Sequence, residues 1–364
     1  MTQAILLNPG PVNVDPAVKA AIAGEDWCHR EPEMFVLQDR IRSGILEALS
    51  LASAKWTVAL LSGSGTCAVE AMISSFVPRG ATMVVVSNGV YGDRVSKMGR
   101  AHGVDVVEVL SDPSEAPDLA RVEAAIVDAR QAGRQVRALS AIHHETTTGL
   151  LNPIAAIGAL AKKYDLAYLL DTVSGLGGEA VDLDAIGVAA AACTANKCFE
   201  GLPGVCFVLA RRDALATVAS DPPKTLYLHV PTYVAKQDAR DTPFTPAVQV
   251  MMALDVAIAK LKEETLGKRI DRYKRYASIV RTDATRIGLK LWLPEALRSN
   301  TITSFALPAS KTYEQLHDAM RAAGFVIYAG QGDLRTRAFR IANMGQIPDD
   351  ELRRAMRVLA EVIA

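Results

Sequence analysis

The sequence has few aromatic residues, no net charge and no long apolar run. Aromatic side chains make up 5% of its 364 residues, and 40 Lys and Arg residues balance 40 Asp and Glu residues. This balance gives no electrostatic reason to expect a nucleic acid or an anionic membrane as a partner. The N-terminus lacks a basic segment, its apolar run is too short for a signal peptide, and no other stretch is long enough to span a bilayer. We therefore expect a cytoplasmic protein whose partners are small molecules and a second copy of itself.

Cysteine is also scarce. The five cysteines are an odd number in a long chain, and they show no paired Cys-x-x-Cys spacing of the kind that binds zinc. A disulfide framework or a metal centre is therefore not expected. We expect reduced and mostly buried thiols at Cys28, Cys67, Cys193, Cys198 and Cys206.

Hydrophobic residues make up half of the chain, which is enough for a large core and a second, smaller one. From about Trp56 to Leu209, short apolar runs rich in Val, Leu and Ala alternate with helical stretches. This alternation is typical of an α/β fold with a mainly parallel sheet that is covered by helices on both faces. The sequence predicts seven strands, at 57–61, 82–87, 105–110, 136–142, 166–171, 188–193 and 204–209.

The pattern changes after Leu209. A polar, proline-rich stretch that ends at Pro246 is followed by two long helical patterns, at 247–263 and 267–287. The remainder predicts strands at 302–307, 325–328 and 338–342 and helices at 312–323 and 349–363. We expect an N-terminal arm at 1–15, a large domain at 16–246 and a small α+β domain at 247–364.

A glycine-rich segment at 61–68 follows the first predicted strand and opens a helix. Glycine lets the backbone approach a ligand closely, and the free N–H groups at the start of a helix favour an anion. The segment therefore predicts a phosphate site.

The same glycines also match a dinucleotide-binding pattern, Gly-x-Gly-x-x-Ala, so a nicotinamide dehydrogenase is an alternative. That alternative requires an acid at the end of the next strand, where it would bind a ribose. The strand at 82–87 is followed by Asn88 and Gly89, and the first acid after it is Asp93, inside the next helix. The segment therefore favours a phosphate cup, and since no Gly-Lys-Ser/Thr sequence follows it, a nucleoside triphosphatase is excluded.

Asp171 closes a very apolar predicted strand. Open α/β sheets bind their ligands at the carboxyl ends of the strands, and a buried carboxylate is costly without a partner. A protonated pyridine nitrogen would be such a partner. The alternative is a carboxylate that caps a turn at Ser174 and Gly175.

Lys197 follows a strand of small residues, in an apolar turn that ends at Gly201. Such a lysine loses its proton more easily than one on the surface, which suits it to Schiff-base formation, although a lysine at a strand end can also be a solvated loop charge. About 26 residues separate it from Asp171, which leaves room for one βαβ-type connection. Both side chains can then face one crevice, and the pair favours a functional site.

Three further segments have a distinctive composition: Ser-Asn-Gly-Val-Tyr-Gly at 87–92, His-Glu-Thr-Thr-Thr-Gly at 144–149 and Ala-Asn-Lys-Cys at 195–198. With Leu-Asn-Pro-Gly-Pro-Val at 7–12 and Phe-Arg-Ile-Ala-Asn-Met-Gly at 339–345, they resemble the alanine-glyoxylate and serine-pyruvate branch of the class-V aminotransferases. The three segments themselves are most similar to the 2-aminoethylphosphonate:pyruvate transaminases within that branch. The resemblance covers nearly the whole chain, from Leu7 to Gly345. It implies fold type I of the enzymes that use pyridoxal 5'-phosphate, with a large domain around a mainly parallel seven-stranded sheet and a small C-terminal α+β domain.

The resemblance also implies roles around the cofactor. Lys197 carries the Schiff base and moves a proton between substrate and cofactor, and Asp171 keeps the pyridine nitrogen protonated. Tyr91 stacks on the ring face, and Thr146 or Thr147 lies near the ring hydroxyl. The cofactor-binding set that it implies is Ser64, Gly65, Thr66, Tyr91, Thr146, Thr147, Asp171, Asn196, Lys197 and Thr245.

Thr245 has two interpretations. It resembles a residue that reaches the phosphate of the neighbouring subunit, which implies a homodimer with shared active sites. From the residues alone, it could equally cap the helix predicted at 247–263.

The substrate would be held by Gly10, Arg30 and Arg340. Arg340 resembles the arginine that binds the substrate's carboxylate or phosphonate, because a planar fork of donors suits either anion. Gly10 would offer backbone contacts to the same anion. Arg30 lies in a mixed segment: 26–28 resembles the phosphonate enzymes, whereas 29–33, which contains Arg30, resembles the alanine-, serine- and glyoxylate-using enzymes. It either adds a second cationic group or forms a structural ion pair with Glu31 or Glu33.

The sequence therefore predicts a homodimeric aminotransferase that uses pyridoxal 5'-phosphate and moves an amino group from 2-aminoethylphosphonate to pyruvate. The products would be phosphonoacetaldehyde and alanine. One alternative is a serine- or alanine-glyoxylate aminotransferase. Another is a lyase that uses the same cofactor on a substituted aminoethylphosphonate, because β-elimination can follow the abstraction of a proton.

Overall fold

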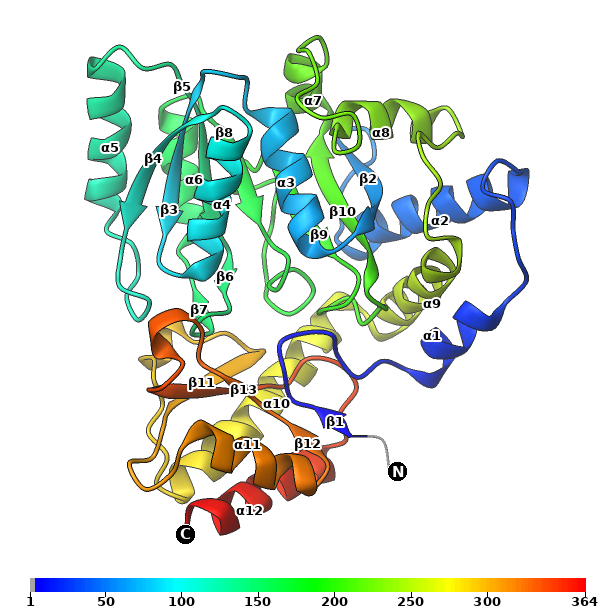
Figure 1. Cartoon of the computed structure of the whole chain (residues 1–364). Coiled ribbons are helices and arrows are strands. Elements are labelled where there is room, and N and C mark those ends of the chain that lie inside the picture. The colour runs from blue at the N-terminus through cyan, green and yellow to red at the C-terminus, as the bar shows by residue number, and fades with distance from the viewer. Residues whose placement is uncertain (1–3) are drawn as a thin grey trace.

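The computed structural model describes residues 4–364, so the first three residues of the predicted arm lie outside the described part of the chain. Its two lobes lie one above the other in Figure 1. The large lobe holds a seven-stranded sheet in the order β2-β10-β9-β8-β5-β3-β4. β10 is antiparallel to both of its neighbours and the other pairs are parallel, which confirms the predicted sheet. The strands are β2 (Trp56–Gly63), β3 (Thr82–Ser87), β4 (Asp105–Leu110), β5 (Val136–Ile142), β8 (Ala167–Asp171), β9 (Ala190–Thr194) and β10 (Gly204–Arg211).

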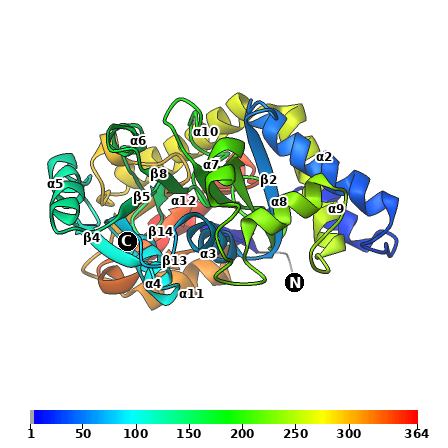
Figure 2. The ribbon, with the colours of Figure 1, turned by 90° about the horizontal axis from the view of Figure 1, so that it is seen from above.

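Helices cover both faces of this sheet, as Figure 2 shows from above. Successive side chains of a strand point to opposite faces, so Met83 and Val85 of β3 pack in one core while Val84 and Val86 pack in the other. Because both faces are covered, central strands such as β9 and β10 are nearly continuous apolar runs. One layer contains α3 (Gly65–Phe76), α4 (Val90–Ala101), α7 (Arg212–Val218) and α8 (Val230–Asp238), and the other contains α2 (Pro32–Ala48), α5 (Leu119–Gln131) and α6 (Ile154–Lys163).

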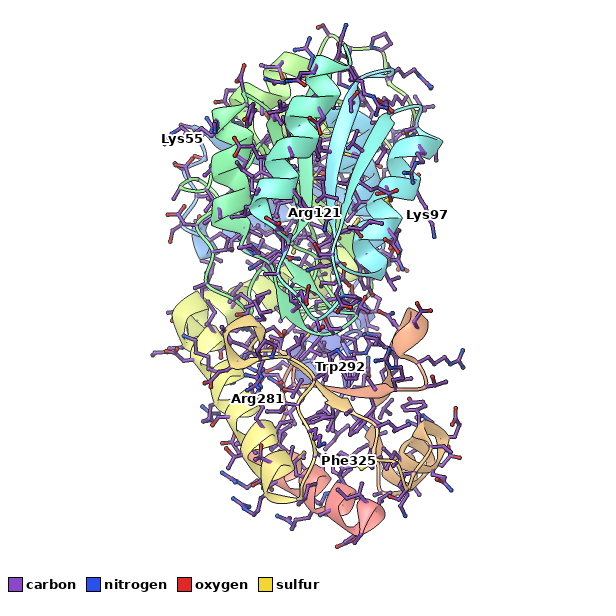
Figure 3. The ribbon with its side chains drawn as sticks, turned by 90° about the vertical axis from the view of Figure 1, so that its left-hand side faces the viewer. Lys55, Lys97, Arg121, Arg281, Trp292 and Phe325 are labelled. Atoms are coloured by element: carbon purple, nitrogen blue, oxygen red, sulfur yellow. The ribbon has the colours of Figure 1, made fainter. Side chains whose placement is uncertain are left out.

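The small lobe is built on an antiparallel sheet in the order β11-β14-β13. Helices pack on this sheet around a core that includes Phe325, which is completely buried and lies inside the lobe in Figure 3. The predicted α+β character of this part is therefore confirmed. Its elements are α10 (Leu266–Arg286), β11 (Ile302–Ala306), α11 (Tyr313–Ala322), β13 (Tyr328–Ala329), β14 (Ala338–Ala342) and α12 (Asp349–Ile363).

The strand predicted at 325–328 is wrong as a single element. β12 (Phe325–Val326) pairs in parallel with β1 (Ile5–Leu6), whereas β13 pairs with β14. The chain therefore changes partner at Ile327. Since β1 lies at the opposite end of the sequence, no local pattern could indicate this change.

The helix predicted at 247–263 is α9 (Val248–Glu264), and it belongs to both lobes. Met251 and Leu254 pack into the core of the large lobe, while Ala253 and Ala257 pack into the core of the small one. The division of the chain near residue 247 therefore stays a prediction.

The remaining short elements are α1 (Pro16–Ala20), β6 (His144–Glu145), β7 (Leu150–Leu151) and 3-10 turns at 21–23, 295–297 and 332–334. Within residues 4–364, no helix is long and apolar enough to cross a membrane, and no three His, Cys, Asp or Glu side chains are grouped to hold a metal ion. The five cysteines are free thiols; Cys193, Cys198 and Cys206 are buried, as predicted, whereas Cys28 is exposed.

Candidate active site

Asp171 lies at the carboxyl end of β8, where the fold places ligands. The residue is 6% exposed, and its Oδ1 accepts a hydrogen bond from the backbone N–H of Val173 at 2.9 Å. Burial raises the pKa of Asp171 to about 6, although the nearby positive charges of Lys197 and Arg94 oppose this. Near neutral pH the group is therefore a poorly solvated carboxylate that a cationic ligand would stabilise.

Lys197 lies in the turn that follows β9, the strand beside β8. Burial lowers the pKa of Lys197, and the charges of Tyr91, Cys198 and Asp171 only partly offset this. Its Nζ donates a hydrogen bond to the backbone oxygen of Pro9 in the N-terminal arm. The lysine and the aspartate therefore reach the site from adjacent strand ends, as predicted from their spacing.

Gly10 allows the arm to pass directly over this lysine. Its φ of +104° is a conformation that other residues rarely adopt. A Cβ atom at this position would lie 3.2 Å from both the Cγ of Lys197 and the backbone oxygen of Asn196. The side-chain Oδ1 of Asn196 accepts a hydrogen bond from the hydroxyl of Thr194 at 2.8 Å.

The predicted phosphate segment forms the start of α3. Ser64 is the N-cap residue but makes no capping hydrogen bond with its side chain. The backbone N–H groups of Gly65 and Thr66 have no acceptor within the described residues, as is usual in the first turn of a helix. A Cβ on Gly65 would lie 2.6 Å from Val173, so only glycine lets the start of α3 pack this closely against Val173. The geometry suits a bound anion.

Arg94 is a functional candidate that the sequence reasoning missed. Its Nη1 donates to the hydroxyl of Thr66 at 3.2 Å, and its guanidinium lies 4.8 Å from the centre of the Tyr91 ring. A small cavity beside these groups is also lined by Gly65 and Asp171. Arg94 follows Tyr91 by about one helical turn. This spacing could have indicated from the sequence that the two side chains are neighbours on the helix. The arginine covers one face of the Tyr91 ring and adds positive charge to the phosphate cup.

The two threonines that the sequence left open differ in the structure. Thr147 is fully engaged, because its hydroxyl donates to Glu145 Oε1 at 2.6 Å and accepts from the N–H of Val90 at 3.1 Å. The hydroxyl of Thr146 is buried and has no partner within the described chain. A hydroxyl in this state is available to a ligand, which favours Thr146 over Thr147.

Arg340, on β14 of the small lobe, faces the same site. It is 2% exposed, and burial lowers its pKa. Its Nε donates to the backbone oxygen of Ala329 at 2.9 Å, and its Nη1 donates to the backbone oxygen of Thr146 and, at 3.3 Å, to Gln331. Its Nη2 has no hydrogen-bond partner within residues 4–364. One arm of a firmly positioned fork is therefore available to an anion.

Two predicted residues are not part of this cluster within one chain. Arg30 is exposed, and within the described chain it forms no ion pair with Glu31 or Glu33, so the structural ion pair considered for it is wrong. Thr245 is exposed too, and its hydroxyl contacts His29 at 3.5 Å. The N-cap of α9 is Ala247, so Thr245 is not the helix cap that the sequence allowed.

The sheet order also excludes the dinucleotide alternative. In that fold, the strand before the glycine-rich loop pairs with the strand that supplies the ribose-binding acid. Here β2 lies at one edge of the sheet beside β10, and β3 lies near the opposite edge. The two strands are therefore too far apart in the sheet to share a dinucleotide.

Known proteins resemble this chain along almost its whole length. Two relatives called 2-aminoethylphosphonate–pyruvate transaminase, from Bacillus mycoides (strain KBAB4) and Bacillus thuringiensis (strain Al Hakam), are 32% and 30% identical, with 98% of this chain and 97% of each relative covered. A solved alanine–glyoxylate aminotransferase from Nostoc sp. has a TM-score of 0.93 and 24% identity, covering 100% of this chain and 96% of that one. An aspartate aminotransferase from Thermus thermophilus has a TM-score of 0.88 and 25% identity, covering 99% of both chains.

The family profile described as "Aminotransferase class-V" matches residues 33–331. This span contains both Asp171 and Lys197 and the phosphate cup. The fold predicted from the resemblance is confirmed by these neighbours and by the sheet order. The chain belongs to the class-V aminotransferases.

Proposed function

We propose that this aminotransferase uses pyridoxal 5'-phosphate to transfer the amino group of 2-aminoethylphosphonate to pyruvate. The observation that carries the proposal is that Lys197, Asp171 and the phosphate cup meet at the carboxyl edge of one sheet. The phosphate cup consists of Gly65 and Thr66 at the start of α3 and the nearby Arg94. The names of the relatives at 30–32% identity support the choice of substrates.

The residues of the cup suit the cofactor. Free N–H groups of α3 and the guanidinium of Arg94 would hold its phosphate, the ring of Tyr91 would lie against its ring, and the unpartnered hydroxyl of Thr146 would meet its ring hydroxyl. Pyridoxal phosphate, when bound, supplies an aldehyde that condenses with amines and a ring that accepts electrons from the adjacent carbon.

Lys197 and Asp171 divide the proton chemistry between them. The lowered pKa of Lys197 favours its neutral form, which can remove a proton from the donor's amine-bearing carbon and return it elsewhere. The carboxylate of Asp171 accepts a hydrogen bond from a protonated ring nitrogen and keeps the proton there. A buried carboxylate with a single backbone donor has the capacity for this second bond.

Arg340 would hold the anionic end of each substrate in turn. Its free Nη2 can donate to a phosphonate or to a carboxylate, so both 2-aminoethylphosphonate and pyruvate can use it. Gly10 lies beside Lys197 and could add a backbone contact. Arg30, as an exposed cation, is proposed only as an outer contact.

A homodimer is part of the proposal. Thr245 is exposed in one chain, which is compatible with a role in the phosphate cup of the partner subunit. The cytoplasmic location expected from the sequence stays a prediction.

A donor panel tests the proposed substrates. Purified enzyme would be mixed with 2-aminoethylphosphonate, serine or alanine, each with pyruvate or glyoxylate, and the products identified by mass spectrometry. We expect phosphonoacetaldehyde and alanine from the first donor with pyruvate. Turnover of serine or alanine without turnover of 2-aminoethylphosphonate would favour the glyoxylate-using alternative, and loss of the amine without an aminated acceptor would favour the lyase.

A further inference from the structure

Glu200 lies three residues after Lys197, in the same turn, but its side chain points away from the site. The turn is closed by hydrogen bonds from the N–H of Glu200 to the oxygen of Lys197 at 2.9 Å and from the N–H of Gly201 to the oxygen of Ala195 at 2.8 Å. Glu200 has a φ of +56°, which is unfavourable for a residue with a side chain. Such a conformation persists where surrounding contacts hold it.

Those contacts come from the small lobe. Glu200 is 3% exposed, and its Oε1 accepts hydrogen bonds from Arg272 Nη2 at 2.8 Å and from the hydroxyl of Tyr273 at 2.5 Å. Its Oε2 accepts from the side-chain amide of Gln346 at 2.6 Å. Arg269 also binds the turn directly, because its Nη1 donates to the backbone oxygen of Cys198 at 3.1 Å.

The charges in this cluster balance. Glu264 accepts from Arg269 Nε at 2.8 Å and from Arg272 Nε at 2.6 Å, so two carboxylates face two guanidiniums. A buried charge is tolerated when it is paired and fully hydrogen-bonded, and removing one partner leaves the others uncompensated. This cluster therefore links the Lys197 turn to the small lobe, and the link depends on each member. The members are Glu200, Glu264, Arg269, Arg272, Tyr273 and Gln346.

The same cluster reaches the strand that carries Arg340. Arg272 Nη1 donates to the backbone oxygen of Gly345 at 2.8 Å, and Gly345 and Gln346 are the third and fourth residues after the end of β14. The backbone of Gln346 also donates to Asn13 in the N-terminal arm at 2.7 Å. One set of hydrogen bonds thus joins the lysine turn to the segment that follows the substrate arginine.

We propose that Glu200 is a positioning residue for the transamination: its carboxylate fixes the backbone of the Lys197 turn relative to the small lobe. Lys197 Nζ is then held at a constant distance from the carbon of a donor whose anion is bound by Arg340. The inference rests on the proposed function, because it assigns Lys197 the proton transfer and Arg340 the substrate anion.

The test compares Glu200→Ala with Glu200→Gln. The control is Asp349→Ala, because the partly exposed Asp349 also binds an arginine of α10, Arg275, at 3.1 Å. We expect Glu200→Ala to lower kcat at least tenfold while the KM of the donor changes less than threefold. The deuterium isotope effect on kcat, measured with a donor deuterated at its amine-bearing carbon, should rise because proton transfer by a misplaced lysine becomes rate-limiting. Glu200→Gln should recover part of kcat, since an amide oxygen can still accept from Arg272 or Tyr273 although the buried negative charge is lost, and Asp349→Ala should match the wild type.

Hydrogen exchange of the cofactor-free protein gives a readout that does not need activity. The backbone N–H groups of Glu200 and Gly201 should exchange at least tenfold faster in Glu200→Ala than in the wild type or in Asp349→Ala. If the wild type transaminates no donor, the proposed function fails, while this measurement still decides whether Glu200 anchors the turn. Unchanged exchange, or an unchanged isotope effect in an active Glu200→Ala enzyme, would overturn the inference. A loss of kcat that disappears on cooling, in step with the melting temperature, would overturn it too.

Discussion

The side-chain nitrogen of Lys197 donates a hydrogen bond to the backbone oxygen of Pro9, which is 188 residues earlier in the chain. The N-terminal arm therefore covers the lysine and excludes water from one side of it. This contact gives Lys197 an acceptor that competes with any ligand for its nitrogen. Forming a covalent bond to a ligand leaves the nitrogen with fewer protons to donate, so the contact with Pro9 is weakened or lost when the lysine reacts.

Lys197→Ala should abolish steady turnover, because no other group in the site can both bind the aldehyde of the cofactor and move the proton. Borohydride reduction of the wild type with bound pyridoxal phosphate, followed by peptide mapping, should place the label on Lys197. The control is Lys224→Ala: burial lowers the pKa of Lys224 to about 8, but this residue lies near Val77, outside the site. A label on Lys224 would show that Lys197 is not the residue that forms the Schiff base with the cofactor.

Asp171→Ala should weaken cofactor binding and slow turnover more than it changes substrate affinity, because the carboxylate is proposed to pair with the cofactor's ring nitrogen and not with the substrate. Loss of a charged hydrogen bond costs about 1.5–3 kcal/mol, which corresponds to roughly a 10- to 150-fold rise in Kd. Equilibrium dialysis against pyridoxal phosphate measures this directly. Normal cofactor retention and turnover would leave Asp171 as a turn cap only.

Asp171→Asn should stabilise the cofactor-free protein at neutral pH. Because burial raises the folded-state pKa of Asp171 to about 6, the folded protein binds this proton more tightly than the unfolded chain does. Burying the ionised carboxylate lowers the free energy of unfolding of the wild type. This loss is absent below about pH 4, grows as the pH rises towards 6 and is complete above it, where it reaches about 2–3 kcal/mol. Urea denaturation at pH 4 and pH 7.5 should give a higher free energy of unfolding for the variant than for the wild type only at the higher pH. A gain of the same size at both pH values would contradict the raised pKa.

Arg340→Lys should weaken both half-reactions, since the ammonium keeps the charge but loses the fork that donates to Ala329 and Thr146. Single-turnover rates with the amine donor and with the oxo acid should both fall by at least tenfold. Arg337→Lys serves as the control, because Arg337 is exposed and stacks on Trp292. If only one half-reaction slowed, a separate site for the second anion would be indicated, and Arg30→Ala should then raise the KM of that partner alone.

Much of the large lobe could be predicted because its strands are buried on both faces. Runs such as 82–87 and 136–142 contain enough Val, Leu and Ala to be recognised locally, and their observed bounds match the predicted ones. Lys197 and Asp171 could be paired because consecutive strand ends share one edge of a parallel sheet. These features depend on short stretches of sequence.

Features that depend on distant segments could not be predicted. The split at Ile327 requires β1, the choice of Thr146 over Thr147 requires Val90, and the anchoring of Glu200 requires Arg272. In each case the local residues allow several partners, and the tertiary fold selects one.

α9 has a consequence for the cooperativity of unfolding. A single rigid helix supplies Leu254 to one hydrophobic core and Ala257 to the other, so melting either core removes part of the wall of its neighbour. The two lobes should therefore unfold together under heat or denaturant. Calorimetry should record one transition, and cleavage at residue 247 should leave neither fragment with a closed core.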